Sequence, residues 1–236
     1  MGHQKLKGME IHMKKKTGIF LIAAISAVTL SACAQTDVVG AVAKTSFAKV
    51  VTASGEAVTA DDMNGGWSLT APDNTARFIW VKDFSASSTH DVMLEFDAAP
   101  FIAAGLDTSK LPDGILNGDK LMVGTDLGDT VIKDSESATP SSSFNEIVDN
   151  YRASVGYHEA LDHYGVDLGG GNKFEWAKDM STNDKDIVFV VDPEILISAG
   201  VNPENVEGWK YASVTVKDST GKSTDVMKFL KPFNLQ

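Results

Sequence analysis

Residues 78–85 read FIWVKDFS and residues 174–181 read FEWAKDMS, so two segments that lie 96 positions apart agree at five of eight positions. The match continues downstream, where residues 91–112 align with residues 186–207 at an offset of 95. The chain therefore carries two copies of one unit of about 90 residues. Each copy is large enough for a small core, whereas a solenoid would have shorter and more numerous repeats.

The stretch between the copies predicts a linker. Residues 134–143 read DSESATPSSS, which is polar and almost free of apolar side chains, a composition typical of linkers. The expected organisation is a signal peptide at 1–32, an anchor and tether at 33–43, a first repeat domain at 44–133, this linker, and a second repeat domain at 144–236.

Within each copy the pattern is mostly that of β-strands. Apolar and polar side chains alternate at residues 92–96, 173–178 and 212–216, and residues 226–230 supply a last strand. A sequence resembling a capping box at Ser143, with helical spacing behind it, predicts a helix at the opening of the second copy. The equivalent stretch of the first copy is richer in Val and Thr and favours neither state.

One short helix interrupts the strands of each copy. In the second copy, Asp192 is a candidate N-cap, Pro193 suits the first helical position and Gly200 suits the residue past the end. Asp97 and Gly105 bracket the counterpart in the first copy. The expected fold class is mainly β (α+β), with two tandem homologous β-rich domains, β-sandwich-like, each with one short capped helix.

Composition narrows the classes of function. The 236 residues include 21 Lys and Arg against 32 Asp and Glu, a net charge of −11, with one cysteine and 43% hydrophobic residues. The negative charge argues against nucleic acid as a partner. The single cysteine excludes a disulfide framework and a Cys-rich zinc domain, and the hydrophobic content excludes wholesale disorder.

The first 33 residues have the organisation of an export signal. Lysines at 14–16 precede an apolar segment at 18–30 that is shorter than the roughly 20 residues a membrane-spanning helix needs. Residues 30–33, LSAC, resemble the lipobox of bacterial lipoproteins. The resemblance implies that Cys33 receives a diacylglycerol thioether, that the chain is cut before it, and that its new amino group is usually acylated. The alternative is a core cysteine near a plain signal peptide.

Removal of the signal changes the charge and predicts a location. Residues 1–32 contain five lysines and one glutamate, so the mature chain keeps 16 basic and 31 acidic residues, a net charge of −15. Because anionic lipid repels such a chain, we expect the lipid on Cys33 to hold it to the membrane. The lipoprotein family usually marks inner-membrane retention with Asp after the cysteine, so Ala34 favours the outer membrane in a Gram-negative host. A Gram-positive host would place it on the outer face of the cell membrane.

No motif of a catalytic nucleophile, a P-loop or a dinucleotide-binding glycine fingerprint occurs, so we expect no catalysis. Features that both copies share favour a scaffold role, and features of one copy are candidates for function. Trp80 and Trp176 are equivalent and are expected to be core anchors.

The asymmetric feature is a cluster of tyrosine and histidine in the second copy. If residues 157–164 are helical, His158 and Asp162 lie four positions apart and can share a face. Imidazole and carboxylate groups suit a transition metal, and Tyr and His can ligate haem iron. The alternative is a solvated helix surface. The candidate ligand-binding residues are Tyr157, His158, Asp162, His163 and Tyr164.

A second candidate occurs in both copies, as loops with oxygen-bearing side chains at alternate positions, a pattern also seen in calcium loops. The alternative is a hairpin loop, where turn chemistry alone favours Asp, Ser and Asn. The residues are Asp83, Ser85 and Ser87 in the first loop and Asp179, Ser181 and Asn183 in the second.

Three functions follow as hypotheses, in decreasing order of support. The first is a lipid-anchored, extracytoplasmic, non-catalytic binding protein that engages a protein or polysaccharide at the cell surface and needs no cofactor. The alternative is a lipoprotein that captures a metal or haem through the Tyr/His cluster. A hydrolytic enzyme comes third, supported only by the abundance of acidic residues.

Overall fold

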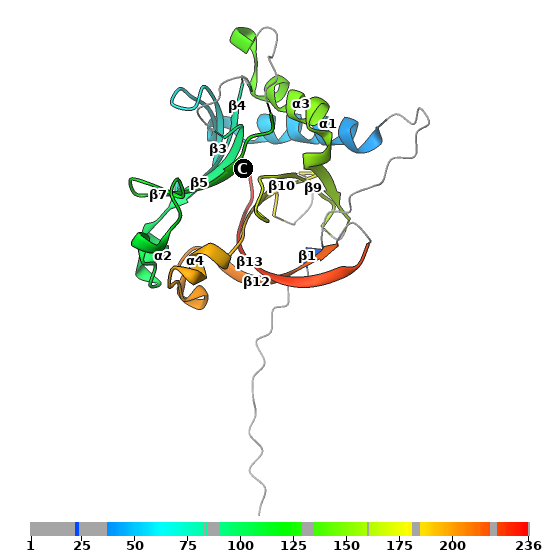
Figure 1. Cartoon of the computed structure of the whole chain (residues 1–236). Coiled ribbons are helices and arrows are strands. Elements are labelled where there is room, and N and C mark those ends of the chain that lie inside the picture. Colours follow the sequence, from blue (N-terminus) through cyan, green and yellow to red (C-terminus); the bar gives the residue numbers. More distant parts are fainter. Residues whose placement is uncertain are drawn as a thin grey trace, which may run out of the picture.

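The computed structural model has two sheets, each with six antiparallel strands, and a two-residue parallel strand adds to the edge of the second; two long helices pack on one side (Figure 1). The fold is mainly β, as the alternating sequence patterns predict. Among the described residues, no helix is long and apolar enough to cross a membrane. The residues that the structure describes are 22–23, 37–82, 84, 90–128, 135–159, 161–180, 185–217 and 221–235.

The first sheet belongs to the first repeat, and its strand order is β2-β3-β4-β5-β7-β6. The elements of this repeat are α1 (Val38–Ala53), β2 (Val58–Asp61), β3 (Gly66–Thr70), β4 (Ala76–Val81), β5 (Val92–Asp97), α2 (Ala99–Ala103), β6 (Leu116–Asn117) and β7 (Lys120–Thr125). Short 3-10 turns lie at Gly55–Ala57 and Thr108–Lys110.

The second sheet repeats this order as β8-β9-β10-β11-β13-β12. Its elements are α3 (Pro140–Asn150), β8 (Val155–His158), β9 (His163–Asp167), β10 (Lys173–Ala177), β11 (Ile187–Val191), α4 (Glu194–Ser198), β12 (Lys210–Lys217) and β13 (Ser223–Phe233). Further 3-10 turns lie at Ser135–Ser137, Arg152–Ser154 and Pro203–Asn205. A two-residue strand, β1 (Ile22–Ala23), pairs in parallel with the edge of β12, and it lies within the segment predicted to be removed as a signal peptide. The duplication in the sequence thus extends to the topology.

Helix α3 begins earlier than the capping pattern at Ser143 predicts, and α1 covers a stretch for which the sequence favoured neither state. Asp37 caps α1 by accepting a hydrogen bond from the backbone N–H of Gly40 at 3.2 Å. Thr139 and Ser142 cap α3 reciprocally, with N–H to Oγ distances of 3.1 and 2.9 Å. Residues 38–43 and 140–143 are therefore helical, although the sequence predicted tether and linker there. Ser and Thr were interpreted as linker composition, but here they satisfy the free N–H groups of a helix start.

One buried cluster contains side chains of both repeats. Phe78 stacks on its equivalent Phe174 with ring centroids 4.0 Å apart, and Phe47 of α1 stacks on Phe144 of α3 at 3.6 Å. Trp80 and Trp176 are fully buried among these rings, which confirms their role as core anchors.

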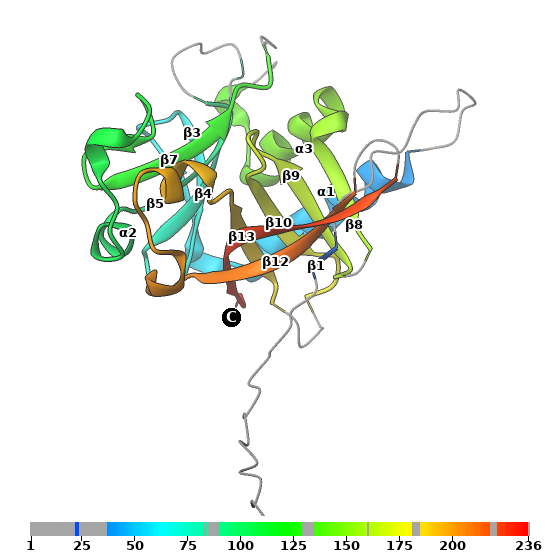
Figure 2. The ribbon, with the colours of Figure 1, turned by 60° about the horizontal axis from the view of Figure 1, so that its bottom comes forward.

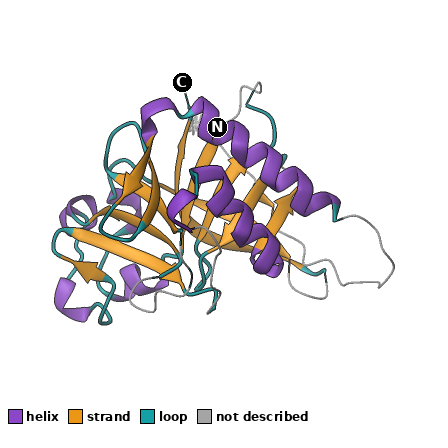
Figure 3. Cartoon of the chain, turned by 90° about the horizontal axis from the view of Figure 1, so that it is seen from above, coloured by secondary structure: helices purple, strands orange, loops and turns teal. Residues whose placement is uncertain are grey.

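Each long helix forms hydrogen bonds with the sheet of the other repeat. The Trp176 indole N–H donates to the Ser46 hydroxyl of α1 at 2.9 Å, and the Trp80 indole N–H donates to the Pro140 carbonyl of α3 at 3.1 Å. The Ser143 hydroxyl of α3 donates to the carbonyl of Val81 in β4 at 2.8 Å. Figure 3 shows the two helices side by side across the strands.

The segments that follow the short helices α2 and α4 also exchange hydrogen bonds between the two repeats. The Asp107 N–H donates to the Ala199 carbonyl, and the Asn202 N–H donates to the Ala104 carbonyl, both at 2.8 Å. The two repeats are therefore related by an approximate two-fold axis.

The repeats differ most at β12 and β13. These strands have 8 and 11 residues, whereas the equivalent of β12, β6, has only two. Figures 1 and 2 show this long ribbon curving across the side of β8, β9 and β10 that faces away from α1 and α3. We call that side of each sheet its outer face.

Candidate functional site

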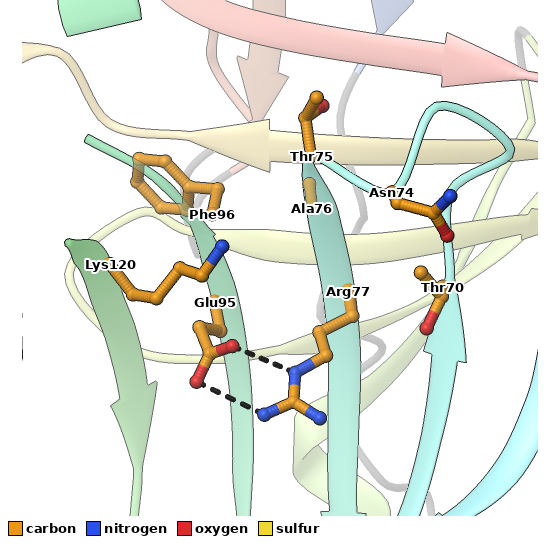
Figure 4. Close-up of a pocket in the computed structure, with 8 residues that line it drawn as sticks. All are labelled: Thr70, Asn74, Thr75, Ala76, Arg77, Glu95, Phe96 and Lys120. Atoms are coloured by element: carbon orange, nitrogen blue, oxygen red, sulfur yellow. Dashed lines mark hydrogen bonds and ion pairs between the residues drawn. The ribbon is translucent and has the colours of Figure 1, made fainter. Parts of the chain in front are cut away.

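The larger cavity lies on the outer face of the first sheet, at the end of the strands nearest the β3–β4 turn (Figure 4). It has a volume of about 290 Å³, which is at the lower limit of typical ligand pockets. The lining residues are Thr70, Asn74, Thr75, Ala76, Arg77, Glu95, Phe96 and Lys120.

Arg77 is the central group of this cavity. Its guanidinium donates to both carboxylate oxygens of Glu95, at 2.8 and 3.2 Å, and lies 3.1 Å from the buried carboxylate of Asp61. Burial alone would lower the pKa of Arg77, but the hydrogen bond and charge of Glu95, with the charge of Asp61, outweigh it and raise the pKa. The guanidinium group of Arg77 is therefore held in a fixed orientation by two carboxylates.

Lys120, at the other side of the cavity, forms an ion pair with Asp97. That hydrogen bond raises the pKa of Lys120, against a smaller effect of burial. Each cation of the cavity thus has a carboxylate partner, and hydroxyl and amide groups surround them. A cavity of this kind suits a polar ligand that both donates and accepts hydrogen bonds.

A smaller cavity occupies the outer face of the second sheet, beneath the β12–β13 ribbon. We call it the ribbon hollow; its volume is about 60 Å³. One buried water molecule needs roughly 10–15 Å³ of cavity volume, so the hollow has room for only a few non-hydrogen atoms. Its lining residues are His158, Gly171, Lys173, Glu175, Val190, Val214, Val216 and Lys228.

Two of these groups are ionisable and fully enclosed. The side chains of His158 and Glu175 are 1% and 4% exposed, and the imidazole Nδ1 lies 3.5 Å from a carboxylate oxygen of Glu175. Within the described part of the chain, the buried Nε2 of His158 has no hydrogen-bond partner. A buried polar atom of this kind is uncommon and calls for an explanation.

Residues 157–164 are not helical, so the condition under which His158 and Asp162 would share a helix face is not met. The segment is a β-hairpin in which β8 pairs with β9, with Tyr157 opposite Tyr164 and His158 opposite His163. The sequence carries the signal for this pairing, since residues 155–158 read VGYH and residues 163–166 read HYGV, the same four residues in mirror order.

Strand geometry separates the five candidate residues. Because successive side chains point to opposite faces of a strand, the two tyrosines face the helix side and the two histidines face the outer side. Tyr164 is 5% exposed and stacks on the core residue Trp176 at 6.2 Å. The structure therefore brings His158 close to His163, but not to the tyrosines.

Asp162, in the hairpin turn, interacts with Tyr157. The Tyr157 hydroxyl donates to the Asp162 carboxylate at 2.6 Å. This bond, with burial second, raises the pKa of Tyr157 to about 12. Burial and the charge of Asp162 raise the pKa of Tyr164 as well. Both phenols are thus protonated at neutral pH.

Other sequence candidates fall largely outside the described residues. These are Cys33 and the loop residues Asp83, Ser85, Ser87, Ser181 and Asn183. Asp179 is described and exposed. Within the described ranges, no group of three or more His, Asp or Glu side chains is arranged to hold a metal ion.

Sequence reasoning missed the groups that line the two cavities, apart from His158. One signal was available for Glu175, since it stands where the first copy has Ile79 in the repeated motif. An acid that replaces an isoleucine on a buried strand is informative in itself. Comparison of the chain with family models, with curated proteins and with solved structures finds no match.

Proposed function

We propose that this protein is a lipid-anchored, extracytoplasmic binding protein without catalytic activity. The observation that carries the proposal is the position of Cys33 at the end of LSAC, directly behind an apolar segment of signal-peptide length. Of the readings of that segment, a cleaved lipoprotein signal agrees best with its short length and its flanking residues.

The start of the folded body fits a short tether. Helix α1 is capped by Asp37, so only residues 34–36 separate the cap from Cys33. At about 3.5 Å per extended residue, this tether reaches roughly 15 Å. Asp37 is also ion-paired with Arg152 of the second repeat. On this proposal the body stands close to the membrane and presents its other surfaces to a partner.

The binding part of the proposal is supported by the cavity around Arg77. Its charged groups are fixed by carboxylate partners, so little side-chain freedom is lost when a ligand binds. A protein loop or a polysaccharide, with alternating donors and acceptors, suits such a surface.

The alternative of metal or haem capture is less well supported. The pairing of β8 with β9 places the histidines and tyrosines on opposite faces, and the ribbon hollow is far smaller than a haem pocket.

The anchor is tested by Cys33→Ser, followed by fractionation of cells that express the full chain. We expect the variant to leave the membrane fraction or to remain as the uncleaved precursor, because it lacks the thiol that accepts lipid. Ala34→Ser, which keeps the cysteine, should behave as the parent protein. Normal processing and full membrane retention of Cys33→Ser would contradict the proposal.

A further inference from the structure

Arg77 on the outer face of the first sheet and Lys173 on the outer face of the second occupy equivalent positions, but their neighbours differ. Strand pairing makes Lys173 of β10 the equivalent of Arg77 of β4, and Val190 of β11 the equivalent of Glu95 of β5. Glu95 neutralises Arg77, but valine cannot neutralise Lys173. Among the residues that the structure describes, Lys173 has no carboxylate within ion-pair distance.

A second exchange changes the other partner. His158 of β8 takes the place of Asp61 of β2, the second acid bound to Arg77. Glu175 takes the place of Ile79 and lies beside His158 rather than beside the cation. The second repeat has therefore lost both acids that neutralise the cation and gained a buried imidazole–carboxylate pair.

The remaining wall of the ribbon hollow is apolar. Val190 and Val214 are 3% and 6% exposed, and Val216 joins them along the lining. The second cation of the hollow, Lys228, is already paired with Asp192. The hollow thus offers the ammonium group of Lys173, one imidazole nitrogen without a partner, and a surface of valine methyl groups, beside the carboxylate of Glu175. Asp167 of β9 stands opposite Lys173 but forms no ion pair with it.

We propose that the ribbon hollow binds a small aliphatic carboxylate, with its oxygens between Lys173 and His158 and its alkyl part against the valines. The Lys173 ammonium donates to one oxygen, and the His158 Nε2–H donates to the other. The other ring nitrogen, Nδ1, stays beside the carboxylate of Glu175, 3.5 Å away. The proposal does not depend on the lipid anchor.

Charged groups from several strands surround His158. Glu175 on β10 lies 3.5 Å from its Nδ1, and Lys173 stands two positions away on the same strand. On the neighbouring strand β9 lies the buried His163. Across the hollow, Lys228 of β13 is neutralised by Asp192.

The experiment is calorimetric titration of the detergent-solubilised protein with acetate, propionate and inorganic phosphate. We expect propionate to bind more tightly than phosphate, because only propionate uses the apolar wall.

Two variants and a control separate the site from general charge attraction. Lys173→Gln should weaken propionate binding by about tenfold or more, as expected for loss of a charge-assisted hydrogen bond. His158→Gln should also weaken propionate binding, because it alters the donor at the buried Nε2 position. Lys49→Gln, at an exposed position of α1, should leave propionate binding unchanged.

The proposal is overturned by absence of propionate binding, by phosphate binding as tightly as propionate, or by equal binding in Lys173→Gln. Circular dichroism of each variant checks the fold. Because Lys173 is only partly buried, its variant remains informative even if His158→Gln fails to fold.

Discussion

At the residue scale, the Tyr157–Asp162 pair makes a prediction for alkaline pH. The pKa of Tyr157 is raised to about 12, above the ordinary value of about 10. A group with a raised pKa in the folded state stabilises it below the unfolded pKa, and this contribution is lost as the pH rises through the folded pKa. The free energy of unfolding should therefore fall between about pH 10 and 12.

The measurement is phenolate absorbance during a pH titration. Asp162→Asn should lower the pKa of Tyr157, because the amide removes both the carboxylate acceptor and its negative charge. An unchanged tyrosine titration in the variant would mean that the hydrogen bond of 2.6 Å does not control this group.

Gly200 makes a second prediction at this scale. It has a φ of +107°, and a Cβ there would lie 2.9 Å from the carbonyl oxygen of Gly105. Gly114 also has a positive φ, of +86°, but a Cβ there would meet no atom within 4 Å. Gly200→Ala should lower the free energy of unfolding by about 1–3 kcal/mol more than Gly114→Ala does, because it adds overpacking to backbone strain.

Urea denaturation of the two glycine variants measures this difference. An equal loss of unfolding free energy in both variants would contradict the prediction. It would show that only backbone strain acts and that the backbone near Gly105 can move away from the added Cβ.

At the scale of elements, the sequence predicts the strands well and the helix starts poorly. Residues 173–178 and 92–96 alternate because one face of each strand packs into the core, and both are strands as expected. The start of α3 was missed because Thr139 and Ser142 resemble linker composition. Composition cannot show that their hydroxyls cap a helix.

The hairpin of β8 and β9 shows a different limit. His158 and Asp162 lie four residues apart, which fits a helix, but the mirror order of residues 155–158 and 163–166 fits a hairpin. In the hairpin each residue of one strand stands opposite an identical residue of the other, so tyrosine pairs with tyrosine on one face of the sheet and histidine with histidine on the other. Of the residues that line the ribbon hollow, the sequence predicted only His158. The hollow is closed by the β12–β13 ribbon, whose residues Val214, Val216 and Lys228 lie far from His158 in the sequence.

At the scale of the whole molecule, the shared core predicts that the two repeats unfold together. Phe78 and Phe174 stack at 4.0 Å across the approximate two-fold axis, so a cavity in one repeat removes contacts from the other. Phe174→Ala should cost about 3–5 kcal/mol, typical of a large buried ring. Hydrogen exchange should become faster in β4 of the first repeat as well as in β10.

The control for this prediction is Met63→Ala, at a side chain that is 88% exposed, which should leave exchange unchanged. Faster exchange confined to the second repeat would contradict a common core and would favour two independent domains.

The central claim is that the duplicated body is carried on a lipid at Cys33. The most direct measurement is the intact mass of the protein extracted from cell membranes, with fragmentation of its N-terminal peptide. The account predicts a chain that begins at Cys33 and carries the mass of a diacylglyceryl group, with or without a further acyl chain. A membrane-extracted chain with an unmodified cysteine, or one cleaved at another residue, would contradict it.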